Sequence, residues 1–265
     1  MKYLLRLAAL WAGCSLLKAQ DATPDLLLHP EKELAASIPA SAPVTLAPTL
    51  DGQPVSFSNP QILLQKSSGP AEFISAVWKG SDGKPLHSRE VFVVKPDYEI
   101  VVDHLYGAAG EHSIVRSFVL PAGPVSADAL GVQVMLDGGK VFRVQANDTG
   151  HAELQAKPTQ VGLQNISSAK TLILTSPAKL PLPISTVLAS WTGSSGPKIE
   201  MVRAGNPLVV KFKVTFPNGR VDLIALAWES RLLHLDEKMP DQKAFHGWAA
   251  LWQRGPAGES TVEIN

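Results

Sequence analysis

The sequence has almost no cysteine and no excess of either charge. Cys14 is the only cysteine and lies near the amino end, so the rest of the chain has no disulfide and no thiol chemistry. Lysine plus arginine equal aspartate plus glutamate, at 24 each. A chain without a basic excess lacks the electrostatic footprint of proteins that bind nucleic acid or anionic membranes. We therefore expect no nucleic-acid partner.

Long apolar runs are also missing, except for a short one at the amino end. Two positive charges in residues 1–6 precede an apolar segment from Leu7 to Leu17, which is too short to span a bilayer comfortably. This order is typical of a secretory signal peptide. We predict a signal peptide over residues 1–19, cleaved after Ala19, and no transmembrane span once this leader is removed.

The same leader has a second interpretation. Cys14 follows Ala-Gly, as in the box of a bacterial lipoprotein, although Trp11 stands where that box usually has leucine. A lipid on Cys14 would then anchor the mature chain. We favour the cleaved, unanchored form. Either form predicts a protein that is secreted, periplasmic or part of the cell envelope.

Residues 20–60 differ in composition from the rest of the chain. This segment is rich in alanine, proline, serine and threonine, and residues 37–44 read SIPASAPV. Such sequences favour an extended chain without a packed core. We predict a linker-like arm over residues 20–60, with at most one short helix from Leu26 to Ala36.

From residue 61 onwards the pattern predicts an all-β domain that extends to residue 265. Short runs rich in β-branched and aromatic residues alternate with turn signals about every ten residues, which is typical of a large antiparallel β-sandwich. The strongest turns are at residues 95–97, 137–140 and 217–220, where proline, aspartate, asparagine or glycine meet. The expected strands are residues 72–78, 88–94, 99–103, 113–120, 132–136, 141–144, 151–155, 171–175, 184–191, 198–203, 208–216, 221–227, 244–252 and 260–264.

Tryptophan offers one route to sugar binding, because a flat apolar ring can stack on a sugar ring. Trp78, Trp191 and Trp228, however, stand within apolar strands. We therefore predict that these rings pack in the core. Trp248 and Trp252 are four residues apart and are candidates to line one side of the final strands.

One stretch is more specific than these patterns. Residues 88–107 read SREVFVVKPDYEIVVDHLYG. They resemble a strand–turn–strand in the C-terminal β-sandwich of heparinase II/III-type polysaccharide lyases, where the wording is close to R-x-V-x-F-V-K-P-D-Y-W-V-V-V-D-x-L-x-G. The Gly-Glu-His at residues 110–112 and the Pro-Ala-Gly at residues 121–123 continue the likeness. The clear match covers residues 88–123, and a looser one covers most of residues 60–255.

The resemblance implies a fold and a class of substrate. Lyases of this family combine an N-terminal helical toroid with the sandwich, and they cleave uronic-acid-containing polysaccharides by β-elimination. A tyrosine or histidine removes the C5 proton while a neighbouring group neutralises the carboxylate. This sequence shows no counterpart of the toroid and none of the family's His-rich metal loop. We therefore expect an exported sandwich that binds or helps to process acidic polysaccharide without a complete lyase site of its own.

Two alternatives remain open. The chain is either the sandwich half of a split lyase, completed by a separately encoded helical toroid, or a structural envelope module that docks other proteins. We assign no catalytic residue and expect no cofactor.

Six polar residues on or beside the matched hairpin are our candidates for substrate binding: His87, Arg89, Tyr98, His104, Tyr106 and His112. Arginine can hold a carboxylate or sulfate through two parallel hydrogen bonds. Side chains alternate along a strand, so we expect His104 and Tyr106 on one face and Asp103 with Leu105 on the other. The alternative is that these are ordinary solvated residues at a strand end.

The same hairpin offers Asp103, His104 and His112 as metal ligands. Neither spacing among them forms a recognised ligand motif. We therefore predict no metal.

Overall fold

The computed structural model describes residues 48–55, 60–147, 160–166, 169–202, 209–234 and 244–265. Within these ranges the chain folds into two antiparallel sheets, and the one helical element is a single 3-10 turn, η2 (Asp137–Gly139). The described residues include no helix with the length and hydrophobicity needed to cross a bilayer. The predicted signal peptide, the predicted helix and the strand expected at residues 151–155 lie outside the described residues, as does most of the arm.

The larger sheet contains the sequence that resembles the lyase family. Its hydrogen-bonded order is β3-β4-β5-β6-β11-β9-β8-β7, while β1 pairs with both β6 and β2, and β10 pairs with β11. The strands are β1 (Thr49–Leu50), β2 (Gln53–Pro54), β3 (Gln61–Ser68), β4 (Ala71–Lys79), β5 (Pro85–Val94), β6 (Tyr98–Val119), β7 (Val125–Ala127), β8 (Gly131–Met135), β9 (Lys140–Asn147), β10 (Gln160–Ile166) and β11 (Ala169–Thr192).

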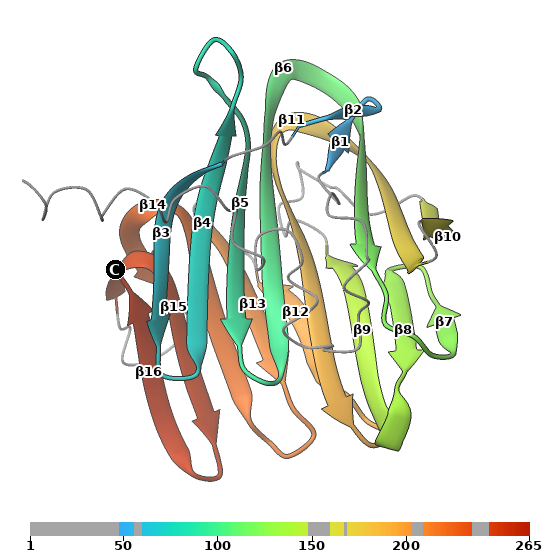
Figure 1. Cartoon of the computed structure of the whole chain (residues 1–265). Helices are drawn as coiled ribbons and strands as arrows, with labels where there is room; N and C mark the ends of the chain where they lie inside the picture. The colour runs from blue at the N-terminus through green and yellow to red at the C-terminus, as the bar shows by residue number, and fades with distance from the viewer. Residues whose placement is uncertain (1–47, 56–59, 148–159, 167–168, 203–208, 235–243) are drawn as a thin grey trace, which may run out of the picture.

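The smaller sheet is formed by the last five strands in simple sequence order (Figure 1). Each strand is joined to the next, and all pairs are antiparallel. These strands are β12 (Lys198–Val202), β13 (Val209–Thr215), β14 (Val221–His234), β15 (Ala244–Gly255) and β16 (Gly258–Ile264). The fold is the large antiparallel β-sandwich that the sequence predicted.

The larger sheet is buried on both faces. Alternate residues of β4 and β5, such as Phe73 and Phe92, join a core that also contains Phe212 of the smaller sheet. Their neighbours Ile74 and Val91 belong to a second core on the opposite face. A sheet covered on both sides has near-continuous apolar strands instead of strict alternation, which is the pattern of residues 91–94.

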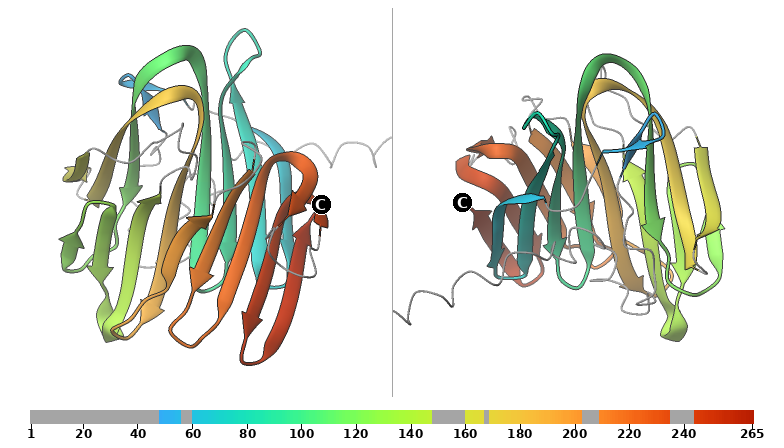
Figure 2. Two further views of the ribbon diagram at one scale, coloured as in Figure 1. Left: turned by 180° about the vertical axis from the view of Figure 1, so that it is seen from behind. Right: turned by 45° about the horizontal axis from the view of Figure 1, so that its top comes forward.

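Two very long strands, β6 and β11, connect the two halves of the larger sheet. The sequence predicted two strands in place of each: residues 99–103 and 113–120 in place of β6, and residues 171–175 and 184–191 in place of β11. The structure instead has one strand of 22 residues and one of 24. The two bend together over residues 107–112 (Figure 2), where their register shifts between the Leu180–Gly110 pair and the Leu182–Leu105 pair. We call this segment, residues 107–112 with the facing part of β11, the arch.

The three predicted hairpin turns are confirmed. Residues 95–97 join β5 to β6, residues 137–139 join β8 to β9, and residues 217–220 join β13 to β14. In the first turn the Asp97 amide donates to the Val94 carbonyl at 2.8 Å. The strands β1, β2, β3, β7 and β10 were not among those expected from the sequence.

The tryptophans whose side chains are described lie in three different hydrophobic clusters. Trp78 is buried in the second core, as predicted, and Trp191 packs against the core between the sheets. The expectation that Trp248 and Trp252 share one side is wrong: Trp248 packs against the core between the sheets, whereas Trp252 belongs to a cluster with Ala225 and Ala250. The side chain of Trp228 lies outside the described residues.

Candidate functional site

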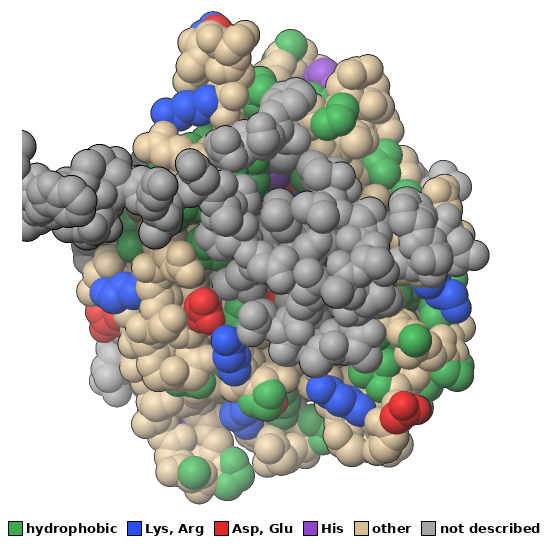
Figure 3. Space-filling view, viewed as in Figure 1, with side chains coloured by type: hydrophobic (Ala, Val, Ile, Leu, Met, Phe, Trp, Pro, Cys, Tyr) green, Lys and Arg blue, Asp and Glu red, His purple; other side chains and the backbone are tan. Residues whose placement is uncertain are grey.

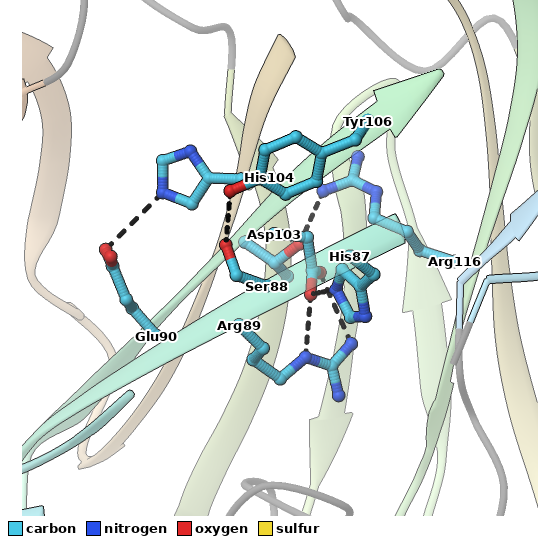
Figure 4. A network of polar contacts seen from close by, with 9 residues as sticks. His87, Ser88, Arg89, Glu90, Asp103, His104, Tyr106 and Arg116 are labelled. Carbon is cyan, nitrogen blue, oxygen red and sulfur yellow. Dashed lines mark hydrogen bonds and ion pairs between the residues drawn. The ribbon is translucent and has the colours of Figure 1, made fainter. Parts of the chain in front are cut away.

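The β5–β6 hairpin carries most of the candidate residues, and its register decides which of them meet. Arg89 lies opposite Asp103, and Ser88 lies opposite His104. Because paired residues point to the same side of a sheet, adjacent pairs point to opposite sides. The hairpin therefore carries two polar clusters, one on each face (Figure 4).

The first, which we call the inner cluster, consists of His87, Arg89, Asp103 and Arg116 and lies on the face of the second core. His87 Nε2 and Arg89 Nε each donate to Asp103 Oδ1 at 2.7 Å, and Arg89 Nη2 donates to Oδ2 at 3.3 Å. His87 also stacks on Trp78, with ring centroids 4.8 Å apart. All of these side chains are buried.

Burial and pairing shift the protonation of this cluster. Burial alone would raise the pKa of Asp103, but the charge of Arg89 and the hydrogen bond from His87 hold that pKa far below its ordinary value. Burial lowers the pKa of His87 despite the neighbouring carboxylate. At neutral pH the cluster therefore contains an ionised Asp103 carboxylate and a neutral His87 imidazole beside two arginines.

Arg116 joins the inner cluster from the far half of β6, beyond the arch. Its Nη1 donates to the Ser185 carbonyl at 3.0 Å and to Thr186 Oγ1 at 2.6 Å, both on β11. The pKa of Arg116 is lowered to about 10, mainly by burial; the charge of Asp103 opposes this shift and that of Arg89 adds to it. Arg116 was not among the candidates predicted from sequence. The available signal was that Ile114 and Phe118, two residues before and two residues after Arg116, share its face of the strand and are apolar.

The second cluster consists of Ser88, Glu90, His104 and Tyr106 and lies on the face of the larger sheet that points towards the smaller sheet. Glu90 Oε2 lies 3.5 Å from His104 Nε2, and the Ser88 and Tyr106 hydroxyls are 3.4 Å apart. His104 and Tyr106 share this face, as strand alternation predicted. Tyr106 is half-buried and the other three are buried.

The remaining two candidates lie elsewhere. Tyr98 belongs to the core between the sheets, where its hydroxyl donates to Asp222 Oδ2 at 3.0 Å. His112 lies at the arch, with Nδ1 2.7 Å from Asp51 Oδ2 and Nε2 3.0 Å from the Ala108 carbonyl. Both ring nitrogens thus face acceptors, and the hydrogen bond with Asp51 raises the pKa of His112.

The six candidates therefore occupy four places and do not converge. The interpretation of them as solvated strand-end residues is wrong for four buried candidates: His87, Arg89, Tyr98 and His104, which are 0%, 5%, 0% and 3% exposed. A metal site of Asp103, His104 and His112 is also excluded, since the first two point to opposite faces. Within the described residues, no three histidine, cysteine, aspartate or glutamate side chains are grouped to hold a metal ion.

The fold is that of the β-sandwich found in heparinase III-type polysaccharide lyases. The chain is similar to the heparan sulfate lyase HepC from Pedobacter heparinus, with a TM-score of 0.54, 13% identity, and coverage of 69% of this chain and 30% of that one. It is also similar to a structure described as heparinase III, with a TM-score of 0.51, 17% identity, and coverage of 69% and 29%. No family model and no curated protein sequence matches the chain.

These likenesses confirm the fold that residues 88–107 indicated from sequence. At such low identity they show the fold alone. The chain spans about a third or less of the length of these lyases, at 29–30%. Their activity and substrates therefore enter only as support for a proposal.

Proposed function

We propose that this chain is an exported β-sandwich protein that binds acidic, uronate-containing polysaccharide and helps to process it. The supporting observation is the fold: 69% of the chain superimposes on about 30% of a heparan sulfate lyase. The proposed export rests on the predicted leader at residues 1–19.

The arrangement of the candidate residues favours a role without independent catalysis. β-Elimination needs a base at the sugar C5 proton and a second group that neutralises the carboxylate. Tyr98 is enclosed in the core, and His104 is buried beside Glu90. Tyr106 and His112, the two candidates with some exposed surface, are at different places in the arch region and have partners of their own. We therefore assign no catalytic residue.

The arch is the surface that we propose for polysaccharide contact. Tyr106 and His112 lie at or beside it, and Lys179 of β11 lies there opposite Glu111. On the face shown in Figure 3, the visible lysine, arginine, aspartate and glutamate side chains are scattered instead of gathered into one charged patch. We propose that binding uses a few contacts at the arch, and we expect modest affinity that falls with added salt.

The test is a binding measurement on immobilised polymers. The panel contains heparan sulfate, chondroitin sulfate, alginate and neutral dextran, and we expect affinity for one or more uronate-containing polymers and none for dextran. His112→Ala should weaken this binding, whereas Lys95→Ala, in the turn that precedes β6 at the end away from the arch, should not. A chain that binds no uronate-containing polymer would contradict the proposal, and capture of proteins alone would favour a structural envelope module.

A second function is supported by the length of the match, since the chain spans only about 30% of the lyases it resembles. The chain would then be the sandwich half of a split lyase, completed by a separately encoded helical toroid. A neighbouring reading frame that encodes such a toroid would favour this function. Co-expression of the two should release unsaturated sugars that absorb in the ultraviolet, and an absence of these products would count against it.

A further inference from the structure

One edge of a buried guanidinium in the inner cluster is unsatisfied. Arg116 is 1% exposed, and Nη1 is the donor in both hydrogen bonds described for its side chain. Nε and Nη2 of the same side chain have no hydrogen-bond partner in the described part of the chain. Figure 4 shows this guanidinium next to Asp103 and His87. Three N–H donors are therefore buried without an acceptor from the described residues.

The nearest carboxylate of the cluster does not meet this need. Asp103 already accepts from His87 and from Arg89, and neither Nε nor Nη2 of Arg116 donates to it. A buried donor that lacks an acceptor costs the free energy of its lost hydration, and the cost is larger for a charged group. The unsatisfied edge therefore points to a missing acceptor and not to a completed ion pair.

The geometry of the Nε–H and Nη2–H donors indicates which kind of acceptor fits them. The Nε–H and one Nη2–H of arginine are parallel and match two oxygens of a carboxylate or sulfate, which then accepts two hydrogen bonds at once. A spherical halide cannot use both donors with the same geometry. An oxyanion fits the edge better than any single-atom ligand.

A second unsatisfied group lies on the same face. Ser176 is buried, and its Oγ has no hydrogen-bond partner in the described residues. In the register of β6 and β11, Arg116 is opposite Leu174 and Ile114 is opposite Ser176, so Ser176 is a diagonal neighbour of Arg116. A long side chain reaches such a neighbour across strands.

We propose that the Nε–Nη2 edge of Arg116, with the hydroxyl of Ser176, forms a binding site for one oxyanion of the carboxylate or sulfate type. The anion is either free in solution or carried by an acidic sugar, and both present the same pair of oxygens. The site lies on the inner face and does not depend on polysaccharide binding at the arch, so either proposal can fail without the other.

The test measures thermal unfolding against anion concentration at constant ionic strength. The ligands are sodium sulfate, sodium acetate and sodium glucuronate, with glucose as the uncharged control. Wild type should show a saturable rise in Tm, because a ligand that binds only the folded state stabilises it. Arg116→Met should abolish the rise, and Arg116→Lys should weaken the apparent affinity about tenfold because lysine lacks the parallel donors.

The matched control is Arg143→Met, which removes another arginine of the same sheet, one that pairs with Asp128 at 2.7 Å. This variant should respond to anions as wild type does. Sulfate stabilises proteins generally by exclusion from their surface, so the difference between wild type and Arg116→Met is the quantity of interest. Saturation by glucuronate alone indicates a sugar-borne anion, whereas saturation by acetate or sulfate without glucuronate indicates a free one.

Equal responses of wild type and Arg116→Met to every anion would overturn the proposal. If the Arg116 variants do not fold, wild-type crystals soaked in selenate replace them. Anomalous density at the Nε–Nη2 edge of Arg116 would support the site. Density at surface lysines only, with none at this edge, would overturn it.

Discussion

Replacing Asp103 by asparagine removes a negative charge to which both His87 and Arg89 donate. Asp103→Asn keeps the size of the side chain but leaves the buried guanidinium of Arg89 without this counter-charge, and Arg116 lies in the same cluster. Breaking a buried pair in this way costs about 3–5 kcal/mol. For a domain of this size the loss corresponds to a fall in Tm of about 6–20 °C.

The assay is urea unfolding at neutral pH, followed by tryptophan fluorescence, which Trp78 reports from beside His87. Asp128→Asn is the control, because Asp128 also pairs with an arginine but its side chain is 51% exposed, and it should cost less than about 1 kcal/mol. Adding Arg89→Met to Asp103→Asn should recover part of the loss, because the buried guanidinium then no longer lies beside a neutral amide. A cost for Asp103→Asn as small as that of the control would refute the reasoning.

Three further predictions concern other parts of the sandwich. Tyr98→Phe should lower the free energy of unfolding by about 1–2 kcal/mol in urea, since it removes a buried hydrogen bond to a carboxylate of the smaller sheet; an unchanged midpoint would contradict this. Gly131→Ala should cost more than about 2 kcal/mol, because a Cβ there collides with a backbone carbonyl of β9, whereas Gly162→Ala meets nothing and should cost less than about 1 kcal/mol. For His112, whose pKa is raised by Asp51, the stability gained from the pair is present below about pH 6.5 and is lost as pH rises through the folded-state pKa. The stability difference between wild type and His112→Gln should therefore shrink as pH rises from about 6 to 9, and a constant difference would argue against the pair.

The hairpins were predictable because their signals are local. Proline, aspartate and glycine fix the backbone of residues 95–97, 137–140 and 217–220 whatever surrounds them. The arch was not predictable in the same way. Whether Gly107 and Gly110 end a strand or bend it depends on β11, which lies far along the chain and bends with β6. A single sequence does not contain that pairing.

The candidate residues likewise have some features that the sequence could predict and others that it could not. Strand alternation correctly placed His104 and Tyr106 on one face of the sheet and Asp103 on the other, since the period of a strand is a local property. Burial was not foreseen, because it requires that both faces of the larger sheet be covered, and this is a property of the assembled sandwich. Arg116 was missed for that reason: a charged residue in a strand is ordinarily expected to face solvent, and only its apolar neighbours Ile114 and Phe118 argued otherwise.

Binding of heparan sulfate to the purified mature chain, with ultraviolet absorbance recorded in the same cell, tests the central claim most directly. We predict saturable binding that falls with added salt and is weakened by His112→Ala, with no rise in absorbance from unsaturated products. Absence of binding to this and to every other uronate-containing polymer would contradict the claim, as would the release of unsaturated sugars by the chain alone.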